Sequence, residues 1–305
     1  MSWNPAELPG QYGRVVVITG GNAGLGYFAA EQLAATGARI VLASRSEKKA
    51  DAAMESIRER VPSADLGFLQ VDLSSLASAT AAGEQLASWP RLDGLVLNAG
   101  MTTGSTTRET TEDGYELTFA TNYIGHFALA AGAASALLRT PGSRVVGLGS
   151  MATRLVKVEV TDLQSEDRYD FFRAYGFSKH AIHGFVFELD RRLRAADAAT
   201  SAILAHPGFA LDGLSLARPG ITAPAVWQRA LAAVAQGKNR GAAPVVRALL
   251  DPDARGGDFY GPQYQLKGPP RKAVPVPSSS SAEFGAQLWR RSEMWTGLSF
   301  PDLRS

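Results

Sequence analysis

Short apolar runs alternate in this chain with longer stretches of helical periodicity, and this alternation restricts the possible folds more than any other feature. Six runs are too short for core helices and are predicted as strands: residues 14–19, 39–43, 66–70, 92–98, 144–148 and 201–205. The predicted helices span residues 25–36, 47–60, 76–88, 114–138 and 175–195. The pattern predicts an α/β fold in which helices cover both faces of a mostly parallel sheet. Residues 258–260 add a candidate seventh strand.

The length and composition of the chain agree with one large domain. Of its 305 residues, 45% are hydrophobic and 20% are charged, so the chain can bury a substantial core. We expect a single domain over residues 1–305. Residues 262–305 are rich in Pro, Gly and Ser and are expected to form a tail, with a short helix near residues 282–295, that packs on the body.

Charge and cysteine content argue against several classes of partner. The net charge of +2 is small, and basic residues are interleaved with acidic ones, so neither nucleic acid nor an anionic membrane is expected as a partner. The most apolar stretch, residues 127–138, is too short to span a bilayer. The chain has no cysteine, which excludes disulfides and thiolate chemistry and agrees with a cytoplasmic location.

The first predicted strand runs directly into a glycine-rich loop and then into a helix, which is the order of a nucleotide-binding turn. We place the key glycines at Gly20, Gly24 and Gly26. Glycines let the backbone approach a diphosphate, whose charge would meet the amides and the dipole of the helix start. The alternatives are a later register, through Gly24, Gly26 and Ala29, and a flexible turn between packed elements.

Tyr175 and Lys179 stand four residues apart, so they share one face of the predicted helix. A free tyrosine titrates near about 10, and a nearby ammonium would stabilise its phenolate and lower the pKa. The pair could therefore transfer a proton at neutral pH. Taken alone, it is more often an ordinary pair of surface and core residues, so its weight depends on the other motifs.

These motifs together resemble the short-chain dehydrogenase/reductase family. The family's order and spacing are matched by Thr19-Gly20 with Gly24 and Gly26, Asn98-Ala99-Gly100, Asn122, Ser150, Tyr175 with Lys179, and Pro207-Gly208. The resemblance covers most of the chain and implies a single-domain, Rossmann-like doubly wound fold that binds NAD(P). Within the family, the chain looks most like the branch of retinol dehydrogenases, WW-domain oxidoreductases and protochlorophyllide reductases. Three segments suggest this branch: Leu42-Ala43-Ser44-Arg45, Gly268-Pro269-Pro270 and Leu288-Trp289.

The resemblance and the chemistry of hydride transfer assign roles to four residues. Hydride transfer to a carbonyl carbon leaves negative charge on oxygen, which Tyr175 would protonate and Ser150 would hold. By resemblance, Lys179 would also bind the nicotinamide ribose, and Asn122 would hold a water that links Lys179 to solvent. The expected cofactor-binding set is Gly20, Asn22, Gly24, Leu25, Gly26, Ser44, Arg45, Asp72, Leu73, Asn98, Ala99, Gly100, Tyr175, Lys179, Pro207 and Gly208.

The end of the second predicted strand favours NADP(H) over NAD(H). An acidic residue there would bind the ribose of NAD, whereas this chain has Ser44 and Arg45, which suit a 2′-phosphate. The alternative is that Arg45 is only a solvated charge at a helix start. Asp72 would contact the adenine by resemblance, and its surroundings also predict that it caps the next helix.

Two residues depart from the family pattern. Gly149 stands where a second serine is common, and Asp212 stands where a threonine often meets the nicotinamide carboxamide. An aspartate there could accept a hydrogen bond but adds negative charge near the ring. Residues 209–240 are expected to cover the substrate, and their apolar side chains suggest a hydrophobic substrate. An ordinary helix pair would explain the same apolar pattern equally well.

The sequence thus predicts an NADP(H)-dependent oxidoreductase that acts on a carbonyl or secondary alcohol of a small molecule. Two alternatives remain, a catalytically silent NADP-binding sensor or interaction protein and, with less support, a sugar-nucleotide epimerase or dehydratase. No metal site is expected, because the four histidines lack carboxylate or cysteine partners at ligand spacing. Pairing of two copies into a homodimer is a further expectation.

Overall fold

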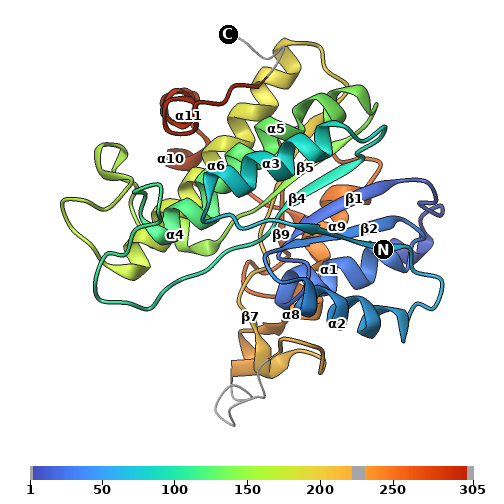
Figure 1. Ribbon diagram of the computed structural model, residues 1–305. Coiled ribbons are helices and arrows are strands. Elements are labelled where there is room, and N and C mark those ends of the chain that lie inside the picture. Colours follow the sequence, from blue (N-terminus) through green and yellow to red (C-terminus); the bar gives the residue numbers. More distant parts are fainter. Residues whose placement is uncertain (1–2, 222–230, 301–305) are drawn as a thin grey trace.

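Parallel strands form the centre of the molecule, as the alternation of apolar runs predicts (Figure 1). The computed structural model describes residues 3–221 and 231–300. Its main sheet has eight strands in the order β10-β9-β6-β5-β4-β1-β2-β3, and only the β9–β10 pair is antiparallel. The strands are β1 (Val15–Thr19), β2 (Arg39–Ser44), β3 (Leu66–Gln70), β4 (Gly94–Leu97), β5 (Arg144–Leu148), β6 (Ser201–Ala205), β9 (Phe259–Pro262) and β10 (Pro270–Lys272).

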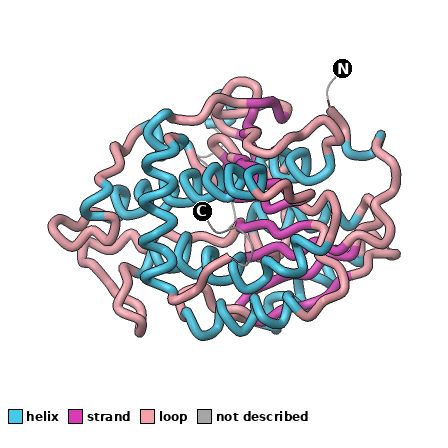
Figure 2. Tube along the Cα trace, turned by 90° about the horizontal axis from the view of Figure 1, so that it is seen from above, coloured by secondary structure: helices cyan, strands magenta, loops and turns pink. Residues whose placement is uncertain are grey.

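Successive side chains of β1 point to opposite faces of the sheet and enter two separate cores. Val16 and Ile18 pack with α1 (Gly24–Ala34), α2 (Glu47–Arg58) and α9 (Ala243–Leu250). Val17 packs with α3 (Leu76–Ala87), α5 (Gly125–Arg139) and α6 (Phe171–Ala195). Figure 2 shows the strands enclosed by helices. The sheet is therefore buried on both faces, which explains its nearly continuous apolar strands.

The structure corrects the continuous helix predicted over residues 114–138. That region divides into α4 (Leu117–Phe119), a π-helical turn η2 (Ala120–Ile124) and α5. Glu116 is the N-cap of α4, and its carboxylate accepts hydrogen bonds from the backbone N–H groups of Thr118 and Phe119. The π-turn carries Asn122, and such turns are frequent at functional sites.

A two-stranded parallel sheet lies apart from the main one. It pairs β7 (Ala210–Leu211) with β8 (Gln236–Gly237), and α8 (Lys238–Gly241) follows directly. The sequence predicted neither α8, α9 nor β10, since each is too short to show a clear period. The single-turn helices are η1 (Pro5–Glu7), η3 (Met151–Arg154), η4 (Val160–Asp162), η5 (Asp212–Leu214) and η6 (Leu231–Ala233). Residues 222–230 of the expected substrate-covering segment lie outside the described residues.

The C-terminal helices pack on the outer face of α5 and α6. After α10 (Pro277–Ser280), helix α11 (Ala282–Thr296) places the Trp289 ring 5.6 Å from Phe127 and 5.9 Å from Phe185, measured between ring centroids. The Arg192 guanidinium lies 4.4 Å from the centroid of the same indole. Aromatic packing of this kind stabilises the attachment of the tail.

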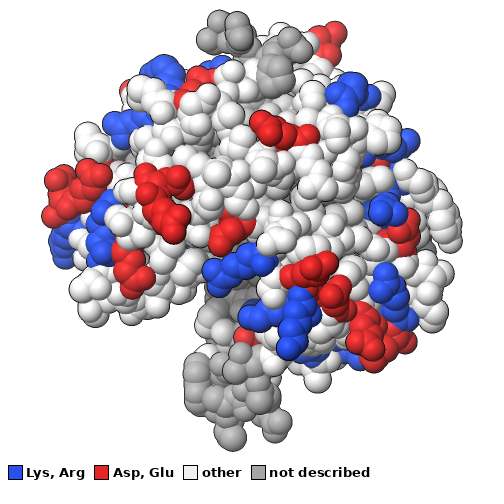
Figure 3. Space-filling view, in the orientation of Figure 1, with Lys and Arg blue, Asp and Glu red and all other residues white. Residues whose placement is uncertain are grey.

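Charged side chains are mixed in sign over the face shown in Figure 3. Among the ion pairs of the described residues, Arg39 lies 3.0 Å from Asp65, with both side chains exposed, and the exposed Lys272 lies 2.8 Å from the half-buried Asp258. Such exposed pairs contribute little to stability. Within residues 3–221 and 231–300, no helix combines the length and the apolar character that crossing a membrane would require.

Glycine at position 149 has a steric reason in the packing of β5 against α6. A Cβ built on Gly149 would lie 2.2 Å from Nε2 of His183, whose side chain is buried in α6. Neither ring nitrogen of His183 has a hydrogen-bond partner within the described part of the chain, and burial holds its pKa well below the usual value. The departure at Gly149 is therefore explained by the imidazole that occupies the space of a serine side chain.

We predict that Gly149→Ser lowers the free energy of unfolding by about 1–3 kcal/mol, because the new side chain overlaps the buried imidazole. His183→Ala should relieve this overlap, so the double variant should lose less stability than the sum of the two single variants. Urea unfolding of the four proteins measures the coupling. Strictly additive losses would contradict a direct clash between the two positions.

Candidate active site

A cavity of about 530 Å³ opens where β1 to β5 end, and this size suits a small-molecule or cofactor site. Most of the residues predicted from sequence line it: Gly20, Asn22, Gly24, Leu25, Ser44, Arg45, Asp72, Leu73, Asn98, Ala99, Gly100, Tyr175 and Lys179. Five predicted residues are not part of this lining: Gly26, Asn122, Ser150, Pro207 and Gly208. The strand ends therefore bring Tyr175, Lys179 and the glycine loop to one cavity.

The glycine loop fits the diphosphate of a dinucleotide. Gly20 and Gly24 have φ angles of +64° and +58°, a backbone conformation that glycine adopts most readily. A Cβ on Gly26 would lie only 2.4 Å from the carbonyl oxygen of Gly20, so this glycine allows α1 to start against the loop. The first turn of α1 consequently faces the cavity with its backbone close to any bound anion.

Thr19, at the end of β1, fixes the loop that follows β4. Its hydroxyl oxygen accepts hydrogen bonds from the backbone N–H groups of Asn98 and Ala99, at 2.9 and 3.0 Å. The Asn98 side-chain amide donates to the carbonyl of Thr19 at 2.7 Å. Asn98 thus acts through the backbone of the glycine loop, which gives a structural reason for an asparagine at this position.

His126 extends these contacts to Asn122. Burial lowers the pKa of His126 to about 4, so its imidazole is neutral at pH 7. Its Nδ1 lies 2.9 Å from the carbonyl oxygen of Asn122, which can only accept, so Nδ1 carries the proton. Nε2, 2.8 Å from the hydroxyl of Thr19, is then an acceptor for that hydroxyl hydrogen, which the carbonyl of Val96 at 3.1 Å also faces. The tautomer inferred in this way links the end of β1 to the π-turn.

The Asn122 side chain is fully engaged with protein groups. Its Oδ1 accepts from the N–H of Met101 at 2.7 Å, and its Nδ2 donates to the carbonyl of Met101 and the hydroxyl of Ser178. A Cβ on Gly100 would lie 3.4 Å from Asn122 Oδ1 and 3.5 Å from Lys179 Nζ. Asn122 and Lys179 therefore both lie next to Gly100, although Asn122 does not line the cavity.

Burial controls the protonation of the Tyr175–Lys179 pair. The Lys179 Nζ lies 5.7 Å from the centroid of the Tyr175 ring and donates to the carbonyl of Leu148 at 2.9 Å. Burial lowers the pKa of Lys179 to about 8. Burial also raises the pKa of Tyr175, and a hydrogen bond with the Ser150 hydroxyl partly offsets this effect. The lowered tyrosine pKa predicted from sequence is therefore wrong for the protein without cofactor.

Ser150 and Asp72 each have a local structural role beside the cavity. Ser150 caps η3 by accepting from the N–H of Ala152 at 3.1 Å, and its own hydroxyl hydrogen is used in the hydrogen bond to the Tyr175 phenol that partly offsets the effect of burial on the pKa of that tyrosine. Asp72 accepts from the N–H and hydroxyl of Ser74, at 2.9 and 2.6 Å. The cap of α3 is Ser75, so the prediction that Asp72 caps this helix is wrong.

The structure adds lining residues that sequence reasoning did not single out: Ala23, Ala43, Val71, Ser74, Met101, Leu117, Thr121, Leu148, Gly220 and Lys238. Several are neighbours of predicted residues, and the strand ends could have indicated them. Gly220 and Lys238 are different, because they reach the cavity from the segment after β6. No local sequence pattern predicts Gly220 and Lys238, because both reach the cavity only through the packing of distant segments against α1 and the loop before it.

The low pKa of Lys179 predicts a pH-dependent stability. Below pH 8 the lysine is charged in both states, and burial of the ammonium destabilises the folded state. Between pH 8 and the unperturbed value of 10.5, the unfolded state binds more protons, so stability rises with pH. We expect the unfolding free energy of the wild type, relative to Lys179→Met, to rise by up to about 3 kcal/mol over this range.

Chemical unfolding at a series of pH values measures this difference. Lys272→Met is the matched control, because it removes an exposed lysine far from the cavity. The same dependence of the unfolding free energy on pH in Lys179→Met and Lys272→Met would contradict the lowered pKa of Lys179.

Comparison with known proteins agrees with this geometry. Residues 14–210 match the family described as short chain dehydrogenase. Short chain dehydrogenase/reductase dpchH of Colletotrichum higginsianum is 33% identical over 310 residues, covering 94% of this chain and 76% of the relative. Human retinol dehydrogenase 13 is 30% identical over 309 residues, covering 98% and 88%.

A solved structure shows the same architecture over nearly the whole chain. It is an uncharacterized protein from Mycobacterium Paratuberculosis, which is 31% identical with a TM-score of 0.80 and covers 99% of this chain and 100% of its own. The match in fold and the match in sequence concern the same segments, including the glycine loop and the Tyr175–Lys179 helix. This chain belongs to the short-chain dehydrogenase/reductase family of oxidoreductases, which bind a nicotinamide cofactor, and it fits the retinol dehydrogenase-like branch.

Proposed function

We propose that this protein is an NADP(H)-dependent dehydrogenase or reductase that interconverts a carbonyl and a secondary alcohol on a hydrophobic small molecule. One observation carries the proposal: Tyr175 and Lys179 line the same cavity as the glycine loop that fits a dinucleotide. A bound nicotinamide would supply or accept the hydride. The protein has to bind the dinucleotide, orient the substrate and move one proton.

Tyr175 is the proton donor to the substrate oxygen, and Ser150 holds that oxygen by donating to it the hydroxyl hydrogen that otherwise meets the Tyr175 phenol. Burial raises the pKa of Tyr175, so the phenolate that remains after proton transfer needs a positive charge to stabilise it. Lys179 supplies it as a buried ammonium 5.7 Å from the phenol ring centroid. Asn122 keeps the loop at Met101 in place through a hydrogen bond in each direction, and in this way it supports the surroundings of Lys179 next to Gly100.

The cofactor would occupy the strand ends, with its diphosphate on the loop of Gly20, Asn22, Gly24, Leu25 and Gly26. Arg45 would bind the 2′-phosphate of NADP(H). It is exposed at the end of β2, and within the described residues it has no ion-pair partner. Ser44, Asp72, Leu73, Asn98, Ala99, Gly100, Pro207 and Gly208 complete the proposed site.

The substrate would lie under residues 209–240, the proposed covering segment. The described part of this segment contributes Gly220 to the cavity and exposes the apolar side chains of Phe209 and Leu216. The relative retinol dehydrogenase 13 is named after retinol, which is an apolar alcohol. Both observations favour a hydrophobic substrate over a sugar or an acid.

Tyr175→Phe should lower kcat by at least 10²–10⁴-fold, because the phenol hydrogen is the proton that the reaction needs. Binding of NADPH should be retained, because the ring remains in place. Steady-state rates with a panel of aldehydes and ketones, together with calorimetric titration of NADPH, test both statements. An undiminished rate in this variant would reject Tyr175 as the proton donor.

Arg45→Asp should shift the preference from NADPH toward NADH, since a carboxylate repels the 2′-phosphate and can bind the ribose hydroxyl. We expect the ratio of kcat/KM values for the two cofactors to change by at least tenfold. Arg58→Asp, an exposed position in the last turn of the following helix, is the control for a general change of charge, chosen in place of Lys48, which could assist Arg45 in binding the phosphate. An unchanged ratio in the Arg45 variant would remove the basis for NADP(H) preference.

A further inference from the structure

Lys238 reaches the cavity although it lies more than 200 residues from the glycine loop in sequence. It follows β8 directly, and Asp212 follows β7, the parallel partner of β8. Leu211 pairs with Gly237 in this register, so the next residue of each strand leaves the sheet at the same end. The Lys238 Nζ accordingly lies 2.7 Å from Asp212 Oδ1.

The ammonium of Lys238 lies beside the first turn of α1. A Cβ built on Gly24 would be 3.4 Å from Lys238 Nζ. Gly24 opens α1, where backbone N–H groups and the helix dipole favour an anion. A fixed positive charge at this distance adds to that field. Of the lining residues at this end of the cavity, Lys238 is the one that brings a full positive charge to the glycine loop.

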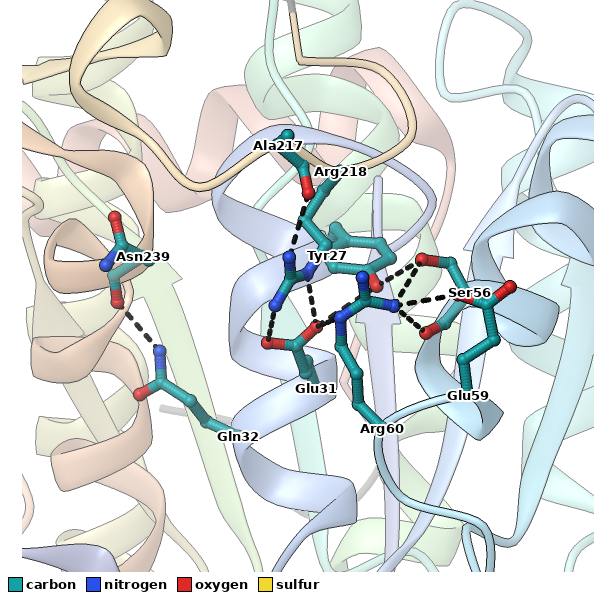
Figure 4. Close-up of polar contacts among 9 residues, drawn as sticks. All are labelled: Tyr27, Glu31, Gln32, Ser56, Glu59, Arg60, Ala217, Arg218 and Asn239. Atoms are coloured by element: carbon teal, nitrogen blue, oxygen red, sulfur yellow. Dashed lines mark hydrogen bonds and ion pairs between the residues drawn. The ribbon is translucent and has the colours of Figure 1, made fainter.

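Close packing holds α8, and with it Lys238, against α1. The Gln32 side chain on α1 donates to the carbonyl of Asn239 at 2.8 Å, as Figure 4 shows. A Cβ on Gly241 would lie 3.0 Å from Leu25, so α8 approaches α1 without room for a larger residue. The backbone N–H of Lys238 is also held, at 2.8 Å, by the hydroxyl of Ser215.

A second tether fixes the loop that precedes this region. Arg218 forms two hydrogen bonds with the Glu31 carboxylate on α1, at 2.7 and 3.2 Å (Figure 4). The Tyr27 hydroxyl lies 3.1 Å from the same Glu31 carboxylate and 3.0 Å from the Ser56 hydroxyl of α2. The Arg218–Glu31 pair is therefore connected to two helices, α1 and α2. Gly220, two residues after Arg218, packs on the glycine loop, because a Cβ there would lie 2.8 Å from the Cβ of Ala23. The loop at Arg218 and helix α8 at Asn239 are thus each held by α1, through Glu31 and Gln32 respectively.

We propose that Lys238 binds the diphosphate of the dinucleotide and that Asp212 positions it. This inference rests on the proposed function, because it needs a dinucleotide in the cavity. A lysine has three donor hydrogens, so Lys238 can stay paired with Asp212 while it donates to a phosphate oxygen. The departure at Asp212 then has a different meaning from the one suggested by sequence. Its carboxylate serves Lys238 rather than the nicotinamide carboxamide.

Calorimetric titration with three probes tests the assignment: NADPH, ADP-ribose, which has the diphosphate without nicotinamide, and 2′-AMP, which has no diphosphate. Lys238→Met should weaken binding of NADPH and ADP-ribose by roughly ten- to hundredfold, the range for a charged hydrogen bond. Binding of 2′-AMP should not change. Lys238→Arg keeps the charge and should recover most of the affinity for ADP-ribose.

Two controls separate this effect from damage to the fold. Lys272→Met removes another ion-paired lysine, which lies on β10 away from the cavity, and should bind all three probes as the wild type does. Lys238→Met combined with Asp212→Asn leaves no uncompensated carboxylate, and its affinity for ADP-ribose should still be below that of the wild type. Thermal unfolding of each variant verifies that it is folded.

The results distinguish two kinds of failure. When Lys238→Met binds ADP-ribose as tightly as the wild type, or loses as much affinity for 2′-AMP as for ADP-ribose, Lys238 does not bind the diphosphate. The proposed function is then unaffected. When the wild type itself binds neither NADPH nor ADP-ribose, the proposed function fails, and this inference fails with it.

Discussion

The buried hydroxyl of Thr19 holds the ends of β1 and β4 together, and the rest of the cavity depends on this junction. It satisfies the N–H groups of Asn98 and Ala99 and, through neutral His126, reaches the π-turn of Asn122. Without it, buried amides would lose their partners at a cost of about 1–3 kcal/mol each. The side of the cavity formed by the glycine loop and the side near Lys179 therefore share one set of hydrogen bonds.

The sheet and most of the cavity could be predicted because both follow from short-range patterns. Apolar runs of strand length marked β1 to β6, and Phe259 and Tyr260 marked β9. In a parallel sheet, residues that follow the strands gather at one edge, so Gly20, Arg45 and Asn98 could be placed together before the structure was known. That Tyr175 and Lys179 share one face of a helix followed from their spacing, whereas their place in the site depended on the other motifs.

What the sequence did not predict depends on contacts between distant segments. Lys238 approaches Gly24 only because β7 and β8 pair, and strands of two residues leave no periodic signal. The direction of the Tyr175 pKa follows from burial, which spacing along a helix does not reveal. Gly149 departs from its family because His183 fills the adjoining space, a relation that appears only when β5 lies on α6.

Helix α11 places Trp289 against Phe127 and Phe185, so the chain covers this aromatic face of α5 and α6 with its own tail. Another protein could reach the face only after α11 had detached. Detachment would return three large rings to water, at roughly 1.5–3 kcal/mol for each. Burial within the chain thus competes with association between chains, and the tail determines which surface remains available to a partner.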